Sequence, residues 1–302
     1  MATLIGLLIG LLAAFLQSVS YVYSSRYMRE CGRGTITLLS PSFVIMSAVS
    51  LLALPVLIPE SLPPLRTFLP AAFFCIGFCL VGHAGLFFML KSVDASRASP
   101  LLAIKVPLLA LFYCLTGIEK YTAVQWVGIL LVVLAAWLLC KAGRRIPLRA
   151  LGWLLVGCMG YSASDFCIKI VLDAFKPVCG SFLHYSLLTL FMIYAAGGAF
   201  GLMGMILSPR IPWRIWKVHV LPYSFFWFTA MMMLFMCFAM SGIVGGNIVQ
   251  STRGLISVVM GWILAKAGYN LLEETVSRAV FHRRILSAVL IILAMMLFNL
   301  GR

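Results

Sequence analysis

Two cationic side chains lie within apolar stretches of the sequence, and they are the side chains of this chain that are best suited to chemistry. Lys105 lies in SPLLAIKVPLL, between Pro100 and Pro107, and Arg253 lies in a second, largely apolar stretch, GNIVQSTRGLISVVMG. A charge at the centre of a bilayer costs about 2.5–3.5 kcal/mol on insertion scales, so it usually faces an aqueous cavity or a partner. A long basic side chain can instead reach back to the headgroup region. The first arrangement predicts an anion-binding site, and the second predicts only an anchored helix.

Polar amides precede Arg253 at helical spacing. Asn247, Gln250 and Arg253 follow one another at intervals of three residues, so they share one broad face of a helix. Such a face can hydrogen-bond a carboxylate or a phosphate, and the planar guanidinium of Arg253 suits either group. The alternative is that the two amides join neighbouring helices, at about 0.6–2 kcal/mol each. We interpret the three residues as candidate substrate ligands and keep this structural alternative.

Two further titratable residues lie inside apolar runs. Asp165 precedes Lys169 by four residues, a spacing that favours an ion pair within one helix. Because no other acidic residue lies as far inside an apolar run, Asp165 is also the natural carrier of a proton, and both interpretations stay open. His83 is a lone histidine in an apolar run, and such a side chain commonly forms a hydrogen bond with a neighbouring carbonyl. The alternative is that His83 lines a polar path.

Helices that cross a membrane must position these residues. The chain has 302 residues, of which 63% are hydrophobic and 10% are charged. A bilayer core takes about 20 apolar residues per helix, and backbone polar groups in lipid must be paired within their own segment. The short connections leave no room for a soluble catalytic domain. The sequence therefore predicts an all-α polytopic membrane protein with ten transmembrane helices, over approximately residues 3–24, 35–58, 68–90, 98–117, 122–140, 150–171, 180–206, 220–240, 247–265 and 285–300.

The basic residues predict an orientation in the membrane. The formal net charge of the chain is +15. In a membrane protein, Lys and Arg residues mark cytoplasmic loops more often than they form a nucleic-acid site. We therefore expect a lipid bilayer as partner and no nucleic acid. Sixteen basic residues lie on one side of the predicted membrane and five on the other, with Lys105 and Arg253 set aside. By the positive-inside rule, the loops after the odd-numbered helices are cytoplasmic. We predict a multi-pass protein of the inner or plasma membrane with both termini outside.

The order of features repeats between two blocks, residues 1–140 and residues 141–302. An offset of 148 residues aligns the stretch around Lys105 with the stretch around Arg253, and a later offset of 159 aligns LVVLAAWL with LIILAMML. Each block holds five predicted helices, and because five is odd the second block is expected to cross the membrane in the opposite sense. Inverted repeats of this kind place a site near the midplane and expose it alternately to each side, which is typical of secondary transporters.

A pattern of mainly small, polar and helix-breaking residues begins just before the fourth predicted helix and extends into the fifth. They are Ser96, Ala98, Ser99, Pro100, Leu101, Pro107, Gly117, Glu119, Gln125 and Gly128. This pattern resembles the drug/metabolite transporter superfamily in its ten-helix EamA-like form, although the ninth helix of this chain lacks the corresponding proline. The resemblance implies two five-helix bundles around a central substrate cavity. It also implies that Gln17, Ser18 and Tyr161 occupy cavity-facing positions.

Together, the residues and the resemblance predict a secondary transporter that moves a small polar metabolite, anionic or zwitterionic, by alternating access. A proton carried by Asp165 or an exchanged metabolite would drive it, because the sequence contains no nucleotide-binding P-loop. We expect no catalytic residue, metal or cofactor. One alternative within the fold is an exporter of amphipathic drugs or amino acids. Another class of function is an intramembrane lipid-modifying enzyme or a non-transporting scaffold, although the sequence has neither an HExxH motif nor clustered acids.

Overall fold

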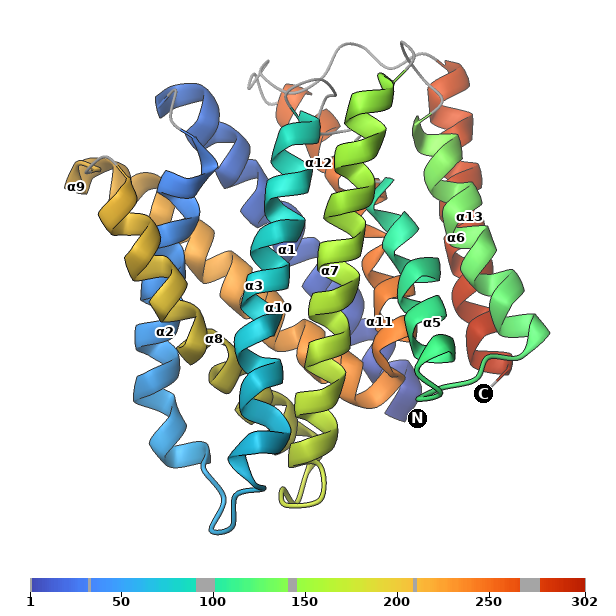
Figure 1. Cartoon of the computed structure of the whole chain (residues 1–302). Coiled ribbons are helices and arrows are strands. Elements are labelled where there is room, and N and C mark those ends of the chain that lie inside the picture. The colour runs from blue at the N-terminus through green and yellow to red at the C-terminus, as the bar shows by residue number, and fades with distance from the viewer. Residues whose placement is uncertain are drawn as a thin grey trace. The chain divides into compact units, whose positions relative to one another are not determined.

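The structure, a computed structural model, describes residues 2–31, 34–90, 101–140, 146–208, 211–266 and 278–301. Every regular element in these ranges is a helix (Figure 1). In chain order the elements are α1 (Ala2–Cys31), α2 (Thr35–Leu57), α3 (Leu65–Leu90), η1 (Leu102–Ile104), α5 (Lys105–Leu115), α6 (Ala123–Cys140), α7 (Leu148–Phe175), α8 (Phe182–Leu207), α9 (Trp213–Ile215), η2 (Trp216–Val220), α10 (Leu221–Ser241), α11 (Ile243–Gln250), α12 (Arg253–Lys266) and α13 (Arg278–Leu300).

The helices have the lengths and composition of membrane spans. Within the described ranges, six stretches are long and apolar enough to cross a membrane, namely Leu4–Met28, Thr35–Leu57, Leu65–Met89, Leu148–Phe175, Phe182–Leu207 and Trp213–Ser241. Shorter apolar helices occur at Leu102–Leu115, Ala123–Leu138 and Ile285–Leu300. The all-α membrane class is therefore confirmed, whereas the number of ten crossings and their inverted arrangement remain predictions.

The chain divides into two compact units, and each unit takes segments from both halves of the sequence. Unit 1 comprises Met1–Leu80 and Ala163–Gly242, and unit 2 comprises Val81–Ser162 and Ile243–Arg302. The long helices α3 and α7 each contribute one part to unit 1 and another to unit 2. The division into two sequence-continuous five-helix repeats, residues 1–140 and 141–302, remains a prediction.

Unit 1 is held by close helix pairs that depend on small residues. The helix α2 packs against α8, and α1 packs against α10. Along α8, a Cβ at Gly201 would lie 2.8 Å from the backbone oxygen of Ser40 on α2. Ser47 donates a hydrogen bond from its hydroxyl to the backbone oxygen of Ala195, at 3.1 Å. Because apolar side chains gain little over lipid in a membrane, close approach and interhelical hydrogen bonds of this kind stabilise the pair.

Close approach at small residues and interhelical hydrogen bonds also stabilise unit 2. The helix α6 packs against α13, and the two lie side by side in Figure 1. A Cβ at Gly128 would lie 2.9 Å from the backbone oxygen of Ala294. The hydroxyl of Ser287 donates to the backbone oxygen of Ala135 at 3.1 Å. Helices α3 and α7 also approach closely within this unit, where Gly85 faces the backbone of Gly157.

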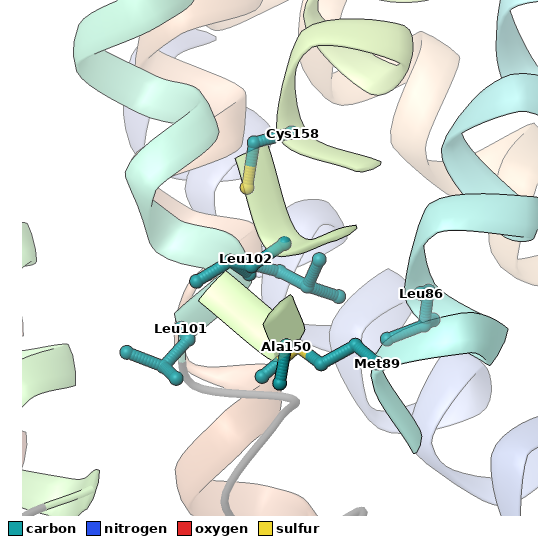
Figure 2. Packing of buried hydrophobic residues seen from close by; sticks show 7 residues of the cluster. Leu86, Met89, Leu101, Leu102, Ala150 and Cys158 are labelled. Atoms are coloured by element: carbon teal, nitrogen blue, oxygen red, sulfur yellow. The ribbon is translucent and has the colours of Figure 1, made fainter. Parts of the chain in front are cut away.

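An apolar cluster in unit 2 holds the segment that leads to Lys105. Leu101 and Leu102, just before and at the start of η1, pack with side chains from the end of α3 and the first part of α7 (Figure 2). The cluster consists of Leu86, Met89, Leu101, Leu102, Ala150, Leu154 and Cys158. These contacts fix the entry to α5 and therefore the place where Lys105 leaves the backbone.

The prediction of one continuous helix over residues 247–265 is wrong. The segment is divided into α11 and α12, with turns at Ser251 and Thr252 between them. The hydroxyl of Ser251 donates to the backbone oxygen of Asn247 at 2.9 Å, and that of Thr252 donates to the backbone oxygen of Val249 at 2.7 Å. Hydroxyls that bond to backbone carbonyls compete with the regular helical pattern, which explains the break.

Candidate functional site

Lys105 is the first residue of α5 and follows a tight helical turn. Its backbone N–H donates to the backbone oxygen of Leu102 across the 3₁₀ turn η1. Pro107 lies two residues further on and has no N–H, so it cannot donate to the carbonyl of Ala103 as an α-helical residue would. The proline thus favours the change from 3₁₀ to α geometry at the residue that carries the charge.

Arg253 occupies the corresponding place after a second break. It is the first residue of α12, and the turn before it has three-residue hydrogen-bond spacing, with Thr252 N–H donating to Val249 and Gly254 N–H donating to Ser251. No proline lies here, and the hydroxyls of Ser251 and Thr252 supply the competing interactions instead. Both cations therefore begin a helical segment, where the helix dipole adds positive potential.

A small cavity in unit 2 joins the two cations. Its volume is about 10 Å³, and it is lined by Leu102, Ala103, Lys105, Asn247, Gln250, Ser251, Arg253 and Gly254. Lys105 and Arg253 are both buried, with exposed fractions of 9% and 7%. The ammonium of Lys105 donates to Oε1 of Gln250 at 2.6 Å, a contact between residues 145 positions apart in the chain. Among the described residues, the lining contains two cations, two amides and a hydroxyl, and no carboxylate.

The side chain of Lys105 is also positioned from α3 and α7. Its ammonium lies 5.9 Å from the centre of the Tyr161 ring, within reach of a cation–π interaction. The ring of His83 meets that of Tyr161 edge-on at 5.3 Å. Gly82 leaves room for the tyrosine, since a Cβ there would lie 2.6 Å from its ring. On the backbone side, the hydroxyl of Ser162 donates to the carbonyl of Lys105 at 3.1 Å.

Six of the predicted site residues thus belong to one connected group in unit 2. Lys105, Arg253, Gln250 and Asn247 line the cavity, and Tyr161 and His83 follow behind Lys105. The amide of Asn247 donates to the backbone oxygen of Ile243 in its own helix at 3.0 Å. Asn247 therefore supports α11 in addition to lining the cavity.

The other predicted residues, Gln17, Ser18 and Asp165, belong to unit 1. Gln17 is buried on α1, and its amide donates to the sulfur of Met231 on α10 at 4.0 Å. Asp165 is buried on α7. Lys169, its expected partner, donates to Asp173 at 2.7 Å, a pair that sequence spacing equally allows. The roles of Gln17 and Asp165 remain predictions.

Sequence reasoning did not find three residues that shape the site. Gly82 makes space for Tyr161, Ser162 binds the carbonyl of Lys105, and Thr252 helps to break the helix before Arg253. For Thr252 a signal was present, because two adjacent hydroxyl residues directly precede the arginine in NIVQSTRG. The contributions of Gly82 and Ser162 depend on which helices meet, which neither residue reveals by its type.

A sequence model of a known family matches the first part of the chain. Residues 4–140 match the sequence model of the EamA-like transporter family. Among curated proteins, no sequence matches the chain significantly.

A solved structure, described only as a "Crystal structure of protein", has a similar fold. Its TM-score is 0.64 at 18% sequence identity, and the match covers 98% of this chain and 96% of the other. At that identity the similarity shows the fold alone. The family match concerns residues 4–140, and it agrees there with the resemblance of the sequence pattern to the EamA-like form of the drug/metabolite transporter superfamily.

Proposed function

We propose that this chain is a secondary transporter that moves a small polar metabolite with an anionic group, or a zwitterion, by alternating access. The observation that carries the proposal is that Lys105 and Arg253, far apart in the sequence, line one cavity in unit 2. The match of residues 4–140 to the model of a transporter family supports the class of function.

The chemistry of the lining favours an anion. An anionic group that enters beside Lys105 and Arg253 forms hydrogen bonds in which both partners are charged, and these are about twice as strong as neutral ones. The guanidinium offers two parallel donors to a carboxylate or phosphate, whereas the ammonium acts as a compact point charge. The amides of Asn247 and Gln250 supply further polar atoms for the uncharged part of a metabolite.

The local backbone supports alternating access. Discontinuous helices commonly hold the substrate in secondary transporters, because their free ends offer backbone dipoles to the ligand. Here the η1–α5 junction and the α11–α12 break each lie directly before a cation. A change of backbone angles at Ser251 and Thr252 would move α11 relative to α12 without breaking the hydrogen bonds inside either helix. A proton on Asp165 or an exchanged metabolite would supply the driving force.

A thermal-unfolding screen of the purified protein tests the substrate class. Amino acids, organic acids and sugar phosphates are added singly, and compounds that raise the unfolding midpoint are titrated. We expect anionic or zwitterionic compounds to stabilise the protein, and we expect Lys105→Ala and Arg253→Ala each to weaken their apparent affinity at least tenfold.

Matched controls separate a site effect from a general loss of charge. Lys120 and Arg214 are exposed, so Lys120→Ala and Arg214→Ala remove the same charges away from the cavity. Both controls should leave the affinities within about a factor of two. If anionic compounds stabilise the Lys105→Ala and Arg253→Ala variants as strongly as the wild-type protein, the proposed substrate class is wrong. Stabilisation by amphipathic cations alone would instead favour a drug exporter.

A further inference from the structure

One exposed face at the start of a membrane span combines basic and apolar side chains. The elements α9, η2 and α10 form one continuous helical stretch in unit 1, and the candidate span Trp213–Ser241 begins with it. We call its exposed first residues the Trp213 face; they are Trp213, Arg214, Lys217, Val218, Leu221 and Phe225. We propose that the Trp213 face binds an anionic phospholipid of the surrounding bilayer, with the headgroup phosphate at the two basic residues and an acyl chain along the apolar ones.

Two tryptophans place the basic residues at the depth of the headgroups. Trp213 has an exposed fraction of 69% and stacks on Trp216, with 6.4 Å between the ring centres. Tryptophan is enriched where a membrane meets water, because its ring is apolar and its N–H is polar. Arg214 and Lys217 lie within about one turn of Trp213, so their long side chains reach the level of the lipid phosphates.

The charges of the Trp213 face call for an anion from outside the chain. Among the residues that the structure describes, neither Arg214 nor Lys217 forms an ion pair with a carboxylate. Glu30, on the adjacent helix α1, pairs instead with Nε of Arg26 at 2.6 Å and with Nε2 of His219 at 3.2 Å. Because Arg214 and Lys217 are three positions apart, they share one side of the helix and can contact the same phosphate.

The backbone keeps the exposed residues in one line. They recur at every fourth position, at Trp213, Lys217, Leu221 and Phe225. An α-helix has about 3.6 residues per turn, so positions four apart drift around its axis. The π-helical turn η2 has wider spacing, with the N–H of Leu221 donating to the carbonyl of Trp216, and it offsets part of this drift. Basic and apolar residues therefore follow one another along a single stripe.

The inner side of the same turn is fixed to unit 1. His219 is buried, and its ring meets that of Tyr27 on α1 edge-on at 5.8 Å. The hydroxyl of Tyr27 in turn shares a hydrogen bond with that of Thr37 on α2, at 2.7 Å. The basic residues thus project from an anchored backbone, which lowers the cost of ordering them around a ligand.

The composition of the face favours an anionic lipid over other sources of phosphate. A zwitterionic lipid carries its own ammonium, which competes with Arg214 and Lys217 for the phosphate. A soluble phosphate compound has no acyl chain to cover Leu221 and Phe225, and Phe225 has an exposed fraction of 66%. An anionic phospholipid complements both parts, because it brings an uncompensated negative charge and an apolar chain together.

The test is native mass spectrometry of the full-length protein in detergent, titrated with dioleoyl phosphatidylglycerol. Dioleoyl phosphatidylcholine is the zwitterionic comparison, and glycerol 3-phosphate is the soluble one. We expect phosphatidylglycerol to bind at least tenfold more tightly than phosphatidylcholine, and an excess of glycerol 3-phosphate not to displace it. Arg214→Gln and Lys217→Gln should each weaken phosphatidylglycerol binding about fivefold, and the double variant at least tenfold. Phe225→Ala should weaken the binding of both lipids.

Matched controls remove the same charges elsewhere. Arg149 and Lys176 are exposed, and Arg149→Gln and Lys176→Gln should leave phosphatidylglycerol affinity within about a factor of two. If the double variant binds phosphatidylglycerol as tightly as the wild type, or if the controls weaken it equally, the proposed lipid site is wrong. Displacement by glycerol 3-phosphate would overturn it in favour of a site for soluble anions. Should the double variant fail to fold, each single variant still decides against its own control. None of these outcomes involves the cavity in unit 2, so the proposed function is tested separately.

Discussion

Two of the groups that hold the Lys105 side chain are neutral, namely the amide of Gln250 and the face of the Tyr161 ring. A cation over an aromatic face gains about 0.5–2 kcal/mol, depending on how far it is desolvated. The ring therefore directs the ammonium without neutralising it. Tyr161 in turn depends on Gly82, where even a methyl group would collide with the ring.

We predict that Gly82→Ala disturbs the site through Tyr161. The added Cβ would lie within 2.6–2.8 Å of three ring carbons, so the ring must move away from its place beside Lys105. Overpacking of this kind typically costs about 1–3 kcal/mol. The unfolding midpoint of the purified protein should fall, and the stabilisation by anions should fall with it.

Gly152→Ala is the matched control for that change. Gly152 lies on α7 in the same unit, and nothing lies within 4 Å of a Cβ at this position. Alanine favours a helix over glycine by about 1 kcal/mol, so this variant should be as stable as the wild type or more stable. Equal behaviour of the two variants would contradict the contact between Gly82 and Tyr161.

We predict that Asp165 carries the coupling proton, and Asp173 offers a comparison on the same helix. Asp165 is buried, whereas Asp173 is half exposed in its ion pair with Lys169. In proteoliposomes, Asp165→Asn should remove the response of substrate uptake to an imposed pH gradient and keep substrate exchange. Asp173→Asn should preserve the response, because an exposed ion pair contributes only about 0–1 kcal/mol. Unchanged pH-driven uptake in Asp165→Asn would exclude Asp165 as the proton carrier.

At the scale of elements, two different sequence features interrupt the regular α-helix close to the two cations. In η1 and α5 the feature is Pro107, which lacks the N–H of a regular helix. Between α11 and α12 it is the pair of hydroxyls at Ser251 and Thr252. The missing proline in the ninth predicted helix is therefore no sign that the break is missing.

We predict that Pro107→Ala separates stability from binding. Alanine supplies the missing N–H and favours a regular α-helix through η1, which would rotate Lys105 away from its present direction. The unfolding midpoint should stay the same or rise, while the affinity for stabilising anions should fall at least threefold. Pro55→Ala, at an exposed position inside α2, is the control and should leave anion affinity unchanged. Equal anion affinity in Pro107→Ala and the wild type would show that the turn does not position Lys105.

The elements were largely predictable from sequence, but their interruptions were not. Runs of apolar residues predict helices because an unpaired backbone in lipid is too costly, and each predicted run contains one. The same argument cannot locate the break between α11 and α12. The hydroxyls of Ser251 and Thr252 bond to backbone carbonyls of their own segment, so both residues are compatible with an apolar run. The pairing of Lys105 with Gln250 joins residues 145 positions apart, and only the packing of α5 with α11 brings them together.

At the scale of the whole chain, similarity in fold extends further than similarity in sequence. The family match is confined to residues 4–140, whereas the structural similarity to a solved structure covers 98% of the chain. The structural similarity therefore extends over the second half of the chain, which the family match does not cover.

The orientation of the chain in the membrane gives a prediction that is independent of the site. The distribution of basic residues predicts that the link at Lys120 lies outside and that the region of Arg214 lies in the cytoplasm. Both side chains are exposed, so Lys120→Cys and Arg214→Cys introduce accessible thiols. A membrane-impermeant maleimide should label Lys120→Cys in intact cells and Arg214→Cys only after the membrane is permeabilised.

Native Cys179 will give background labelling in that experiment, because it lies in the link between α7 and α8 on the predicted outer side. Burial raises the pKa of the Cys179 thiol, which lowers the fraction of reactive thiolate at neutral pH and slows its labelling. The wild-type protein should therefore be labelled more slowly than Lys120→Cys. The substitution Cys179→Ser removes the background labelling that remains. The reverse pattern, with Arg214→Cys labelled in intact cells and Lys120→Cys protected, would place both termini in the cytoplasm and show that the positive-inside rule fails for this chain.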